Sequence, residues 1–211
     1  MLSDNYVTSC SHLPLRILIA PIIAFTIDSL ERNKNIIGAG RCRTKAATYP
    51  SGNLFCLENG QVTVKQADTK ISNGLAWSSD RKKFYFSDTL QYAVFEYDYD
   101  LESGEISNRK VLFKPEEGRG LTDRMCIDSQ DNLWVAFWGG SRIEQRSTKD
   151  GSLLATINVD AKNVTSCCFM GDKLDTLFIT TAATGQSGQH DGCLFTCKGE
   201  VKGLECDYCK V

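Results

Sequence analysis

Three oxygen-bearing side chains recur along the chain, each at the start of an apolar run. Asn73, Asp123 and Thr165 follow one another at intervals of 50 and 42 residues, and a weaker copy starts at Asn33, 40 residues before Asn73. Oxygen atoms of carboxylates and amides are the ligands that hard divalent cations such as Ca²⁺ prefer. If the fold brings these residues together, they form a ring of oxygen atoms suited to such a cation.

The elements that must position these residues are short β-strands. Runs of aromatic and β-branched residues alternate with clusters of Gly, Asn, Asp and Ser, a pattern typical of hairpins, and helical periodicity is nearly absent. The units at residues 73–80, 123–130 and 165–172 each give a polar residue, an apolar strand and a turn. Their spacing matches the roughly 40–50 residues of a four-stranded propeller blade. We therefore predict an all-β fold, a β-propeller with about four recognisable blades from residue 33 onward.

The propeller architecture gives the repeated residues a common place. The first strand of each blade lines the central channel, so residues at the same register in successive blades meet at one mouth of it. A simpler interpretation is that Asn and Asp cap turns, as they often do beside strands. The repeat by itself fits both interpretations.

Composition limits the class of protein. The chain has 211 residues, 24 Lys and Arg against 26 Asp and Glu, and 42% hydrophobic residues, which is typical of one globular domain with a sizeable core. This near-neutral balance without a basic stripe argues against nucleic-acid binding. The apolar run at 13–27 contains Arg16 and Pro21, is shorter than the roughly 20 residues of a membrane span, and lacks a preceding basic segment. We expect a buried strand there and no membrane association, with an atypical signal sequence as the alternative.

Ten cysteines are scattered through the chain, mostly in apolar runs. This usage favours reduced thiols and a cytoplasmic location, with secretion as the alternative. Two cysteine pairs near the C-terminus are separated by eight residues: Cys193 with Cys197, and Cys206 with Cys209. Together they could hold a zinc ion, although the spacing of the first pair is loose for such a site. The alternative is that they are reduced or adventitiously paired thiols.

Several motifs resemble those of the family of regucalcin (senescence marker protein), gluconolactonase and luciferin-regenerating enzyme. They occur in the family's order across about residues 38–205, roughly four fifths of the chain. The motifs are ISNGLAWS at 71–78, FEYDYD at 95–100, ISNR at 106–109, MCID at 125–128, LWVA at 133–136 and TSCCF at 165–169.

The resemblance implies a six-bladed propeller with one divalent metal ion, Ca²⁺ or Zn²⁺ with Mn²⁺ or Mg²⁺ as further options, at the central channel. It implies hydrolysis of sugar lactones, with calcium binding as the other named activity. Asn73 falls on the family's metal-binding Asn. Asp123 falls on the metal-binding Asp, which also resembles the general acid and base of the reaction.

Three departures from the family pattern matter. Family members are longer, and the Glu that supplies the third metal ligand in the family has no recognisable counterpart here. The family's sugar-contacting residues are not retained; Asn33 stands where the family has Asp and is the one candidate substrate contact. Arg124 replaces the Gly that follows the metal-binding Asp and adds a long cation beside the site.

These observations lead to one expected function and one alternative. We expect residues 1–30 to form an atypical N-terminal segment, disordered or replacing a blade strand, and residues 31–211 to form a partial propeller. The expected activity is metal-dependent hydrolysis of a small sugar lactone. The alternative is an inactive, truncated relative that binds calcium or has a regulatory role. Because an open propeller exposes two sheet faces, we also expect self-association through these edges.

Overall fold

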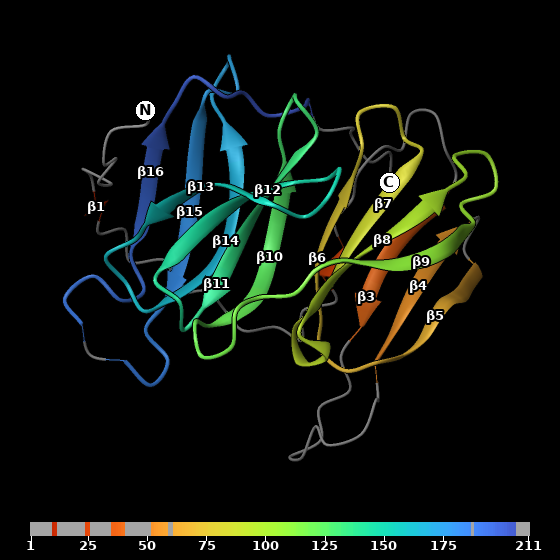
Figure 1. Ribbon diagram of the computed structural model, residues 1–211, viewed down its shortest axis with the longest axis horizontal. Coiled ribbons are helices and arrows are strands. Elements are labelled where there is room, and N and C mark those ends of the chain that lie inside the picture. The colour runs from red at the N-terminus through yellow and green to blue at the C-terminus, as the bar shows by residue number, and fades with distance from the viewer. Residues whose placement is uncertain are drawn as a thin grey trace.

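The chain folds into four four-stranded antiparallel sheets (Figure 1). The computed structural model describes residues 10–11, 24–25, 35–40, 52–58, 61–186 and 188–205. Within these ranges there is no α-helix, and one short 3-10 turn, η1 (Thr89–Gln91), follows a strand. The expectation of an all-β fold is confirmed.

The strands of each sheet follow one another in chain order, with one exception. The first sheet contains β2 (Ala24–Phe25), β3 (Asn35–Gly40), β4 (Gly52–Glu58) and β5 (Gln61–Thr69), and the second contains β6 (Ser72–Trp77), β7 (Lys83–Asp88), β8 (Ala93–Tyr99) and β9 (Ile106–Phe113). The third contains β10 (Leu121–Ile127), β11 (Asn132–Trp138), β12 (Arg142–Ser147) and β13 (Leu153–Asn158). The fourth contains β14 (Asn163–Met170), β15 (Thr176–Ala182), β16 (Leu194–Lys198) and, from the other end of the chain, β1 (Cys10–Ser11).

The first strands of successive sheets lie side by side. Strand β6 packs beside β10, and β10 packs beside β14, so the sheets face one another as propeller blades (Figure 1). A chain that meanders outward through four strands and then returns to start the next sheet produces this arrangement. The predicted propeller with four recognisable blades is therefore confirmed.

Apolar residues from facing sheets form the core. Phe84 and Phe86 of β7 point toward the first sheet, whereas Tyr85 between them packs against the third sheet. In the same way, Leu133 of β11 packs between the second and third sheets, whereas Trp134 packs between the third and fourth sheets. Since both faces of these strands are covered, their sequences are nearly continuous apolar runs. Each fully buried side chain of this size contributes about 1.5–3 kcal/mol to folding.

One part of the predicted repeat was wrong. The copy at residues 33–40 was expected to be the first strand of a blade, but β3 is the second strand of its sheet, paired with β2 on one side and β4 on the other. Asn33 itself lies outside the described residues. The segment resembles the other copies because a short apolar run next to a polar residue can form any strand of a blade, and pairing with neighbours decides which one.

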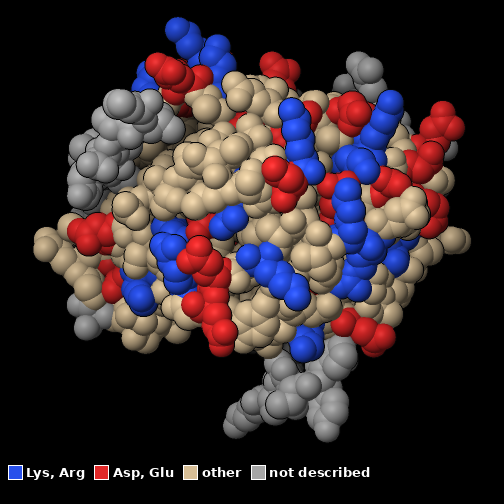
Figure 2. Space-filling model, viewed as in Figure 1, with Lys and Arg blue, Asp and Glu red and all other residues tan. Residues whose placement is uncertain are grey.

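Acidic and basic side chains are interspersed on the face shown in Figure 2. Lys83 binds both Glu96 and Asp98, and Lys110 also binds Glu96, which is buried. The hydrogen bond to Asp98, and to a smaller extent the one to Glu96, raises the pKa of Lys83.

The described residues include no helix long and apolar enough to cross a membrane.

Candidate functional site

The first strands of the second, third and fourth sheets, β6, β10 and β14, each contain a β-bulge at the residue that the repeat singles out. In β6 the pairing with β7 shifts between Ser72 and Leu75, so that Asn73 and Gly74 together occupy the place of one residue. In β10 the pairing with β11 shifts between Thr122 and Met125, which places Asp123 at the equivalent point. A bulge bends the strand and redirects its side chains, and bulges are common beside functional sites.

The first strand of the fourth sheet, β14, also contains a shift in pairing. Its pairing with β15 shifts between Val164 and Ser166, so Thr165 is the extra residue. The Thr165 hydroxyl forms a 2.7 Å hydrogen bond with the hydroxyl of Thr180 on β15. The three repeated polar residues therefore share one structural feature, which the sequence repeat did not reveal.

The bulge in β10 separates two sets of side chains. Met125 packs among the apolar residues between the second and third sheets, and Thr122 accepts a hydrogen bond from Ser87 of the second sheet. In a regular strand two residues three positions apart face opposite sides. Because Thr122 and Met125 face the same side, Asp123 and Arg124 between them are left on the other side, toward β14.

Gly74 allows β6 to approach β10 closely. A Cβ atom added at Gly74 would lie 2.8 Å from the backbone nitrogen of Met125, 2.7 Å from its Cγ and 3.1 Å from the carbonyl oxygen of Asp123. Cβ atoms in proteins essentially never come this close to backbone atoms. The absence of a side chain at Gly74 therefore brings the bulge that carries Asn73 against the bulge that carries Asp123.

We expect Gly74→Ala to destabilise the protein by about 1–3 kcal/mol, because the added methyl group must displace the backbone of β10. Chemical denaturation would measure the loss in the free energy of unfolding. Gly199→Ala is the matched control, since its Cβ would meet nothing closer than 3.9 Å. Equal stability of the two variants would show that β6 and β10 can separate without cost.

A short chain of hydrogen bonds fixes the orientation of Asn73. The hydroxyl of Thr89 donates to the backbone oxygen of Thr122 at 2.7 Å, so the Thr89 oxygen has only acceptor capacity left for Asn73. The Asn73 amide nitrogen donates to it at 2.7 Å. This arrangement assigns nitrogen and oxygen in the amide and leaves the amide oxygen as the atom that could bind a cation.

Two nearby aspartates on the same sheet have different environments. Asp128 is fully buried, and its carboxylate accepts hydrogen bonds from the backbone of Asn132, the indole of Trp134 at 2.9 Å and the amide of Gln145 at 2.8 Å. These donors occupy the carboxylate and make Asp128 a structural residue. Asp123, by contrast, is half-buried on a first strand. The described residues contain no group of three or more His, Cys, Asp or Glu that could hold a metal ion.

Most cysteines whose side chains the structure describes are buried or packed against the core, whereas Cys168 is exposed. Cys193 and Cys197 pack against the apolar residues between the third and fourth sheets, and burial raises the pKa of the Cys197 thiol. Cys206 and Cys209, the second pair of the expected zinc site, lie outside the described residues. Cys126 and Cys167 face each other from β10 and β14, with 3.7 Å between their sulfur atoms. Their mutual hydrogen bond, together with burial, raises the pKa of Cys126.

Sequence reasoning missed the residues that support Asn73. The pair Ser87-Asp88 follows an apolar run and by sequence alone is typical of a turn, and nothing in the sequence singles out Thr89. Instead Asp88 is fully buried and accepts hydrogen bonds from the backbone nitrogens of Lys70 and Ile71, at 2.8 and 2.9 Å. This contact holds the segment that leads into β6. A Ser-Asp-Thr run directly after an apolar strand was the available signal, but it gives no indication of which segment the side chains contact.

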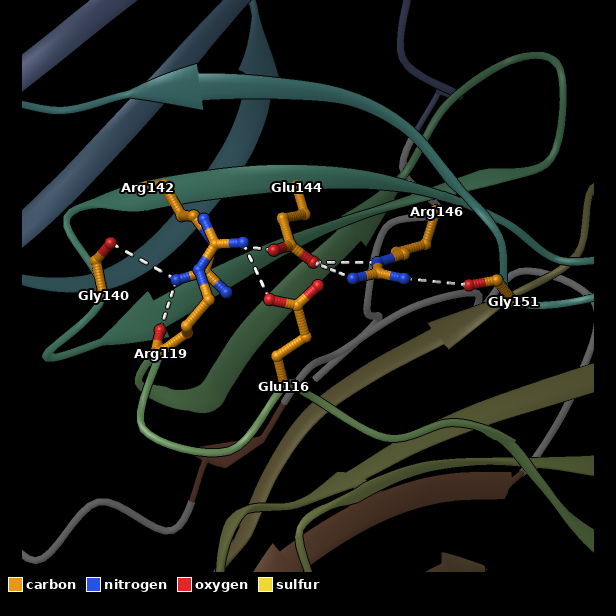
Figure 3. A network of polar contacts seen from close by, with 7 residues as sticks. All are labelled: Glu116, Arg119, Gly140, Arg142, Glu144, Arg146 and Gly151. Carbon is orange, nitrogen blue, oxygen red and sulfur yellow. Dashed lines mark hydrogen bonds and ion pairs between the residues drawn. The ribbon is translucent and has the colours of Figure 1, made fainter.

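A second polar network, apart from the first strands, lies along β12 (Figure 3). Glu144 accepts hydrogen bonds from the guanidinium groups of both Arg142 and Arg146, and all three side chains are largely buried. Arg142 also donates to the backbone oxygens of Arg119 and Gly140. The guanidinium of Arg142 lies 3.9 Å from the ring centre of Phe137, and that of Arg146 lies 4.7 Å from Phe113 on β9. This network joins the third sheet to the second.

Comparison with known proteins agrees with this architecture. A protein of Sulfolobus acidocaldarius with no assigned function is 40% identical over 162 residues, which is 76% of this chain and 58% of that protein. Regucalcin of Danio rerio is 37% identical over 159 residues, covering 72% of this chain and 54% of regucalcin. The chain thus spans little more than half the length of these relatives.

Solved structures of similar fold include members of the same group of proteins. A luciferin-regenerating enzyme structure matches 84% of this chain and 62% of its own, with a TM-score of 0.75 and 34% sequence identity. A calcium-binding protein, regucalcin, from Agrobacterium tumefaciens has the same fold, with a TM-score of 0.75 at 24% identity. Residues 31–183 match the SMP-30/Gluconolactonase/LRE-like region. The chain therefore belongs to the SMP-30/gluconolactonase/LRE-like family.

Proposed function

We propose that this protein is a divalent-metal-dependent lactone hydrolase of the gluconolactonase type. The observation that carries the proposal is the pairing of two equivalent bulges, which bring Asn73 and Asp123 onto adjacent first strands with Gly74 packed between them. Membership of a family that includes gluconolactonases supports the same reaction class. The calcium-binding regucalcin of similar fold supports metal binding.

The two residues fit a hard cation. Asn73 would supply its amide oxygen and Asp123 a carboxylate oxygen, which are the ligand types that Ca²⁺, Mg²⁺ and Mn²⁺ prefer. A single carboxylate offsets only one of the cation's two positive charges, so affinity should be lower than that of a site with two carboxylates. When bound, a divalent ion would polarise the lactone carbonyl and lower the pKa of a water molecule.

Each protein residue then has a defined task. The hydrogen bond from Thr89 to Thr122 holds Asn73 in one orientation, so that its amide oxygen keeps the same direction in every turnover. Asp123 takes a proton from the attacking water as the new bond to the carbonyl carbon forms. It then returns the proton to the ring oxygen as the ester bond breaks, which yields the open hydroxy acid.

Metal removal tests this proposal. The purified chain should hydrolyse a glucono-lactone substrate in the presence of Ca²⁺, Zn²⁺, Mn²⁺ or Mg²⁺, lose this activity in EDTA, and regain it when one of these ions is added back. A pH-indicator assay would follow the acid that is released. Turnover that EDTA leaves unchanged, or no turnover with any ion from folded protein, would contradict the proposal.

A second candidate is a binding protein without catalytic activity. It is favoured by the donor set, because one amide and one carboxylate offer oxygen ligands of the type that calcium prefers but only a single titratable group for chemistry. Calorimetric titration with Ca²⁺ separates the two candidates. Binding that depends on Asp123, in a protein that hydrolyses no lactone, would identify the binding protein.

A further inference from the structure

Arg124 is a half-buried cation that has no hydrogen bond or ion pair within the described part of the chain. Other arginines of this part contact acceptors or acidic groups. The guanidinium of Arg109 binds Gln91, that of Arg119 binds Glu116, and those of Arg142 and Arg146 bind Glu144. A guanidinium carries five donors and is always charged, so a partly desolvated one without an acceptor is unusual.

The bulge in β10 places Arg124 on the same side as Asp123. Arg124 occupies the register that Gly74 has in β6, since each is the second residue of its bulge. The Cβ direction at Gly74 leads to the next first strand, against the backbone of Asp123 and Met125. The two bulges are equivalent, so the side chain of Arg124 should point from β10 to its own next first strand, which is β14.

The charges at this place favour an anionic ligand. Asp123 brings one negative charge and Arg124 one positive charge, and a bound divalent cation would raise the positive charge to three. This excess would weaken cation binding unless the substrate supplies negative charge. The planar guanidinium forms two parallel hydrogen bonds with a carboxylate or a phosphate, and neither bond depends on the lactone ring itself.

We propose that Arg124 is a specificity-determining residue that binds an anionic group of the substrate. The substrate class would then be sugar lactones that carry a carboxylate or a phosphate apart from the ring ester. This inference rests on the proposed lactonase function. It assigns Arg124 to substrate binding and gives it no part in proton transfer.

The first test compares three lactones on the wild-type protein and on Arg124→Gln. They are the neutral glucono-1,5-lactone, 6-phosphoglucono-1,5-lactone and glucaro-1,4-lactone, so that phosphate and carboxylate are tested separately. We expect the ratio of kcat/KM between an anionic and the neutral lactone to fall at least about 10-fold in the variant, as the loss of a charged hydrogen bond predicts. Arg124→Lys should recover part of the ratio, and Arg119→Gln, an exposed arginine outside the site, should leave it unchanged. An unchanged ratio in Arg124→Gln would overturn the proposal.

The second test needs no turnover. Calorimetry would compare binding of D-glucarate and 6-phosphogluconate with binding of D-gluconate, which lacks the additional anionic group. We expect one of the first two to bind at least about 10-fold more tightly to the wild-type protein, with the advantage lost in Arg124→Gln. If the wild-type protein hydrolyses no lactone, the lactonase function fails, and this measurement still decides the role of Arg124. Equal binding of all three acids would overturn it.

Discussion

Asp123→Ala is expected to lower kcat/KM for lactone hydrolysis by at least about 10³-fold while the protein stays folded. General acid and base catalysis contributes about 10²–10⁴-fold by itself. Loss of the carboxylate also removes the negatively charged metal ligand of the proposed site, so both effects act in the same direction. Because Asp123 is half-buried and lies outside the apolar core, its removal should leave the packing of that core intact.

A second substitution separates the two roles of this residue. Asp123→Asn keeps an oxygen atom that can bind a cation but removes the group that accepts a proton. We expect this variant to retain measurable Ca²⁺ binding by calorimetry and to lose turnover. Asp172→Ala, in the exposed turn after β14, is the matched control and should behave as the wild-type protein. Turnover in Asp123→Ala within 10-fold of the wild-type rate would exclude Asp123 as the proton donor and acceptor.

Glu144→Ala is expected to cost about 3–5 kcal/mol of stability. The side chain of Glu144 is 3% exposed, and those of its partners Arg142 and Arg146 are 5% and 12% exposed. Removal of the carboxylate leaves two guanidinium groups away from water without their counter-charge (Figure 3). Breaking a buried ion pair on one side is strongly destabilising for this reason.

Urea denaturation followed by intrinsic fluorescence would measure this loss, since Trp134 and Trp77 are buried in the core. Glu116→Gln is the control. Glu116 binds Arg119 in the same part of the molecule, but the two side chains are 64% and 56% exposed, so the pair should contribute no more than about 1 kcal/mol. A loss below about 1 kcal/mol in Glu144→Ala would mean that water reaches the two arginines.

The first strands show how much of this fold local sequence patterns predict. The positions of Asn73, Asp123 and Thr165 at the start of a blade could be predicted from the sequence because β6, β10 and β14 each repeat a polar residue followed by an apolar run. That pattern arises from local geometry: strands alternate their faces with a period of two, and turns need small or polar residues. The roughly four blades, and the strands that form them, follow from the same local rules.

Contacts between residues far apart in the sequence could not be predicted from these local patterns. The second-strand position of β3 depends on its pairing with β2 and β4 and not on its own sequence. The bulges at Asn73 and Asp123 arise from the register between neighbouring strands. The support of Asn73 by Thr89 joins residues 16 positions apart through the packing of η1 between two blades.

Strand β12 shows most clearly why the sequence alone does not determine which strand faces are buried. The alternation of Arg142, Glu144 and Arg146 places the three charged residues on one face of a strand, which the sequence alone determines. Sequence patterning would assign such a charged face to solvent. Only the tertiary structure decided that the face is buried, because the second sheet packs over it and supplies Phe113. Backbone oxygens of Arg119 and Gly151 accept further hydrogen bonds from the two arginines. The residue types fix the local faces of each strand, whereas the stacking of blades decides which faces are removed from water.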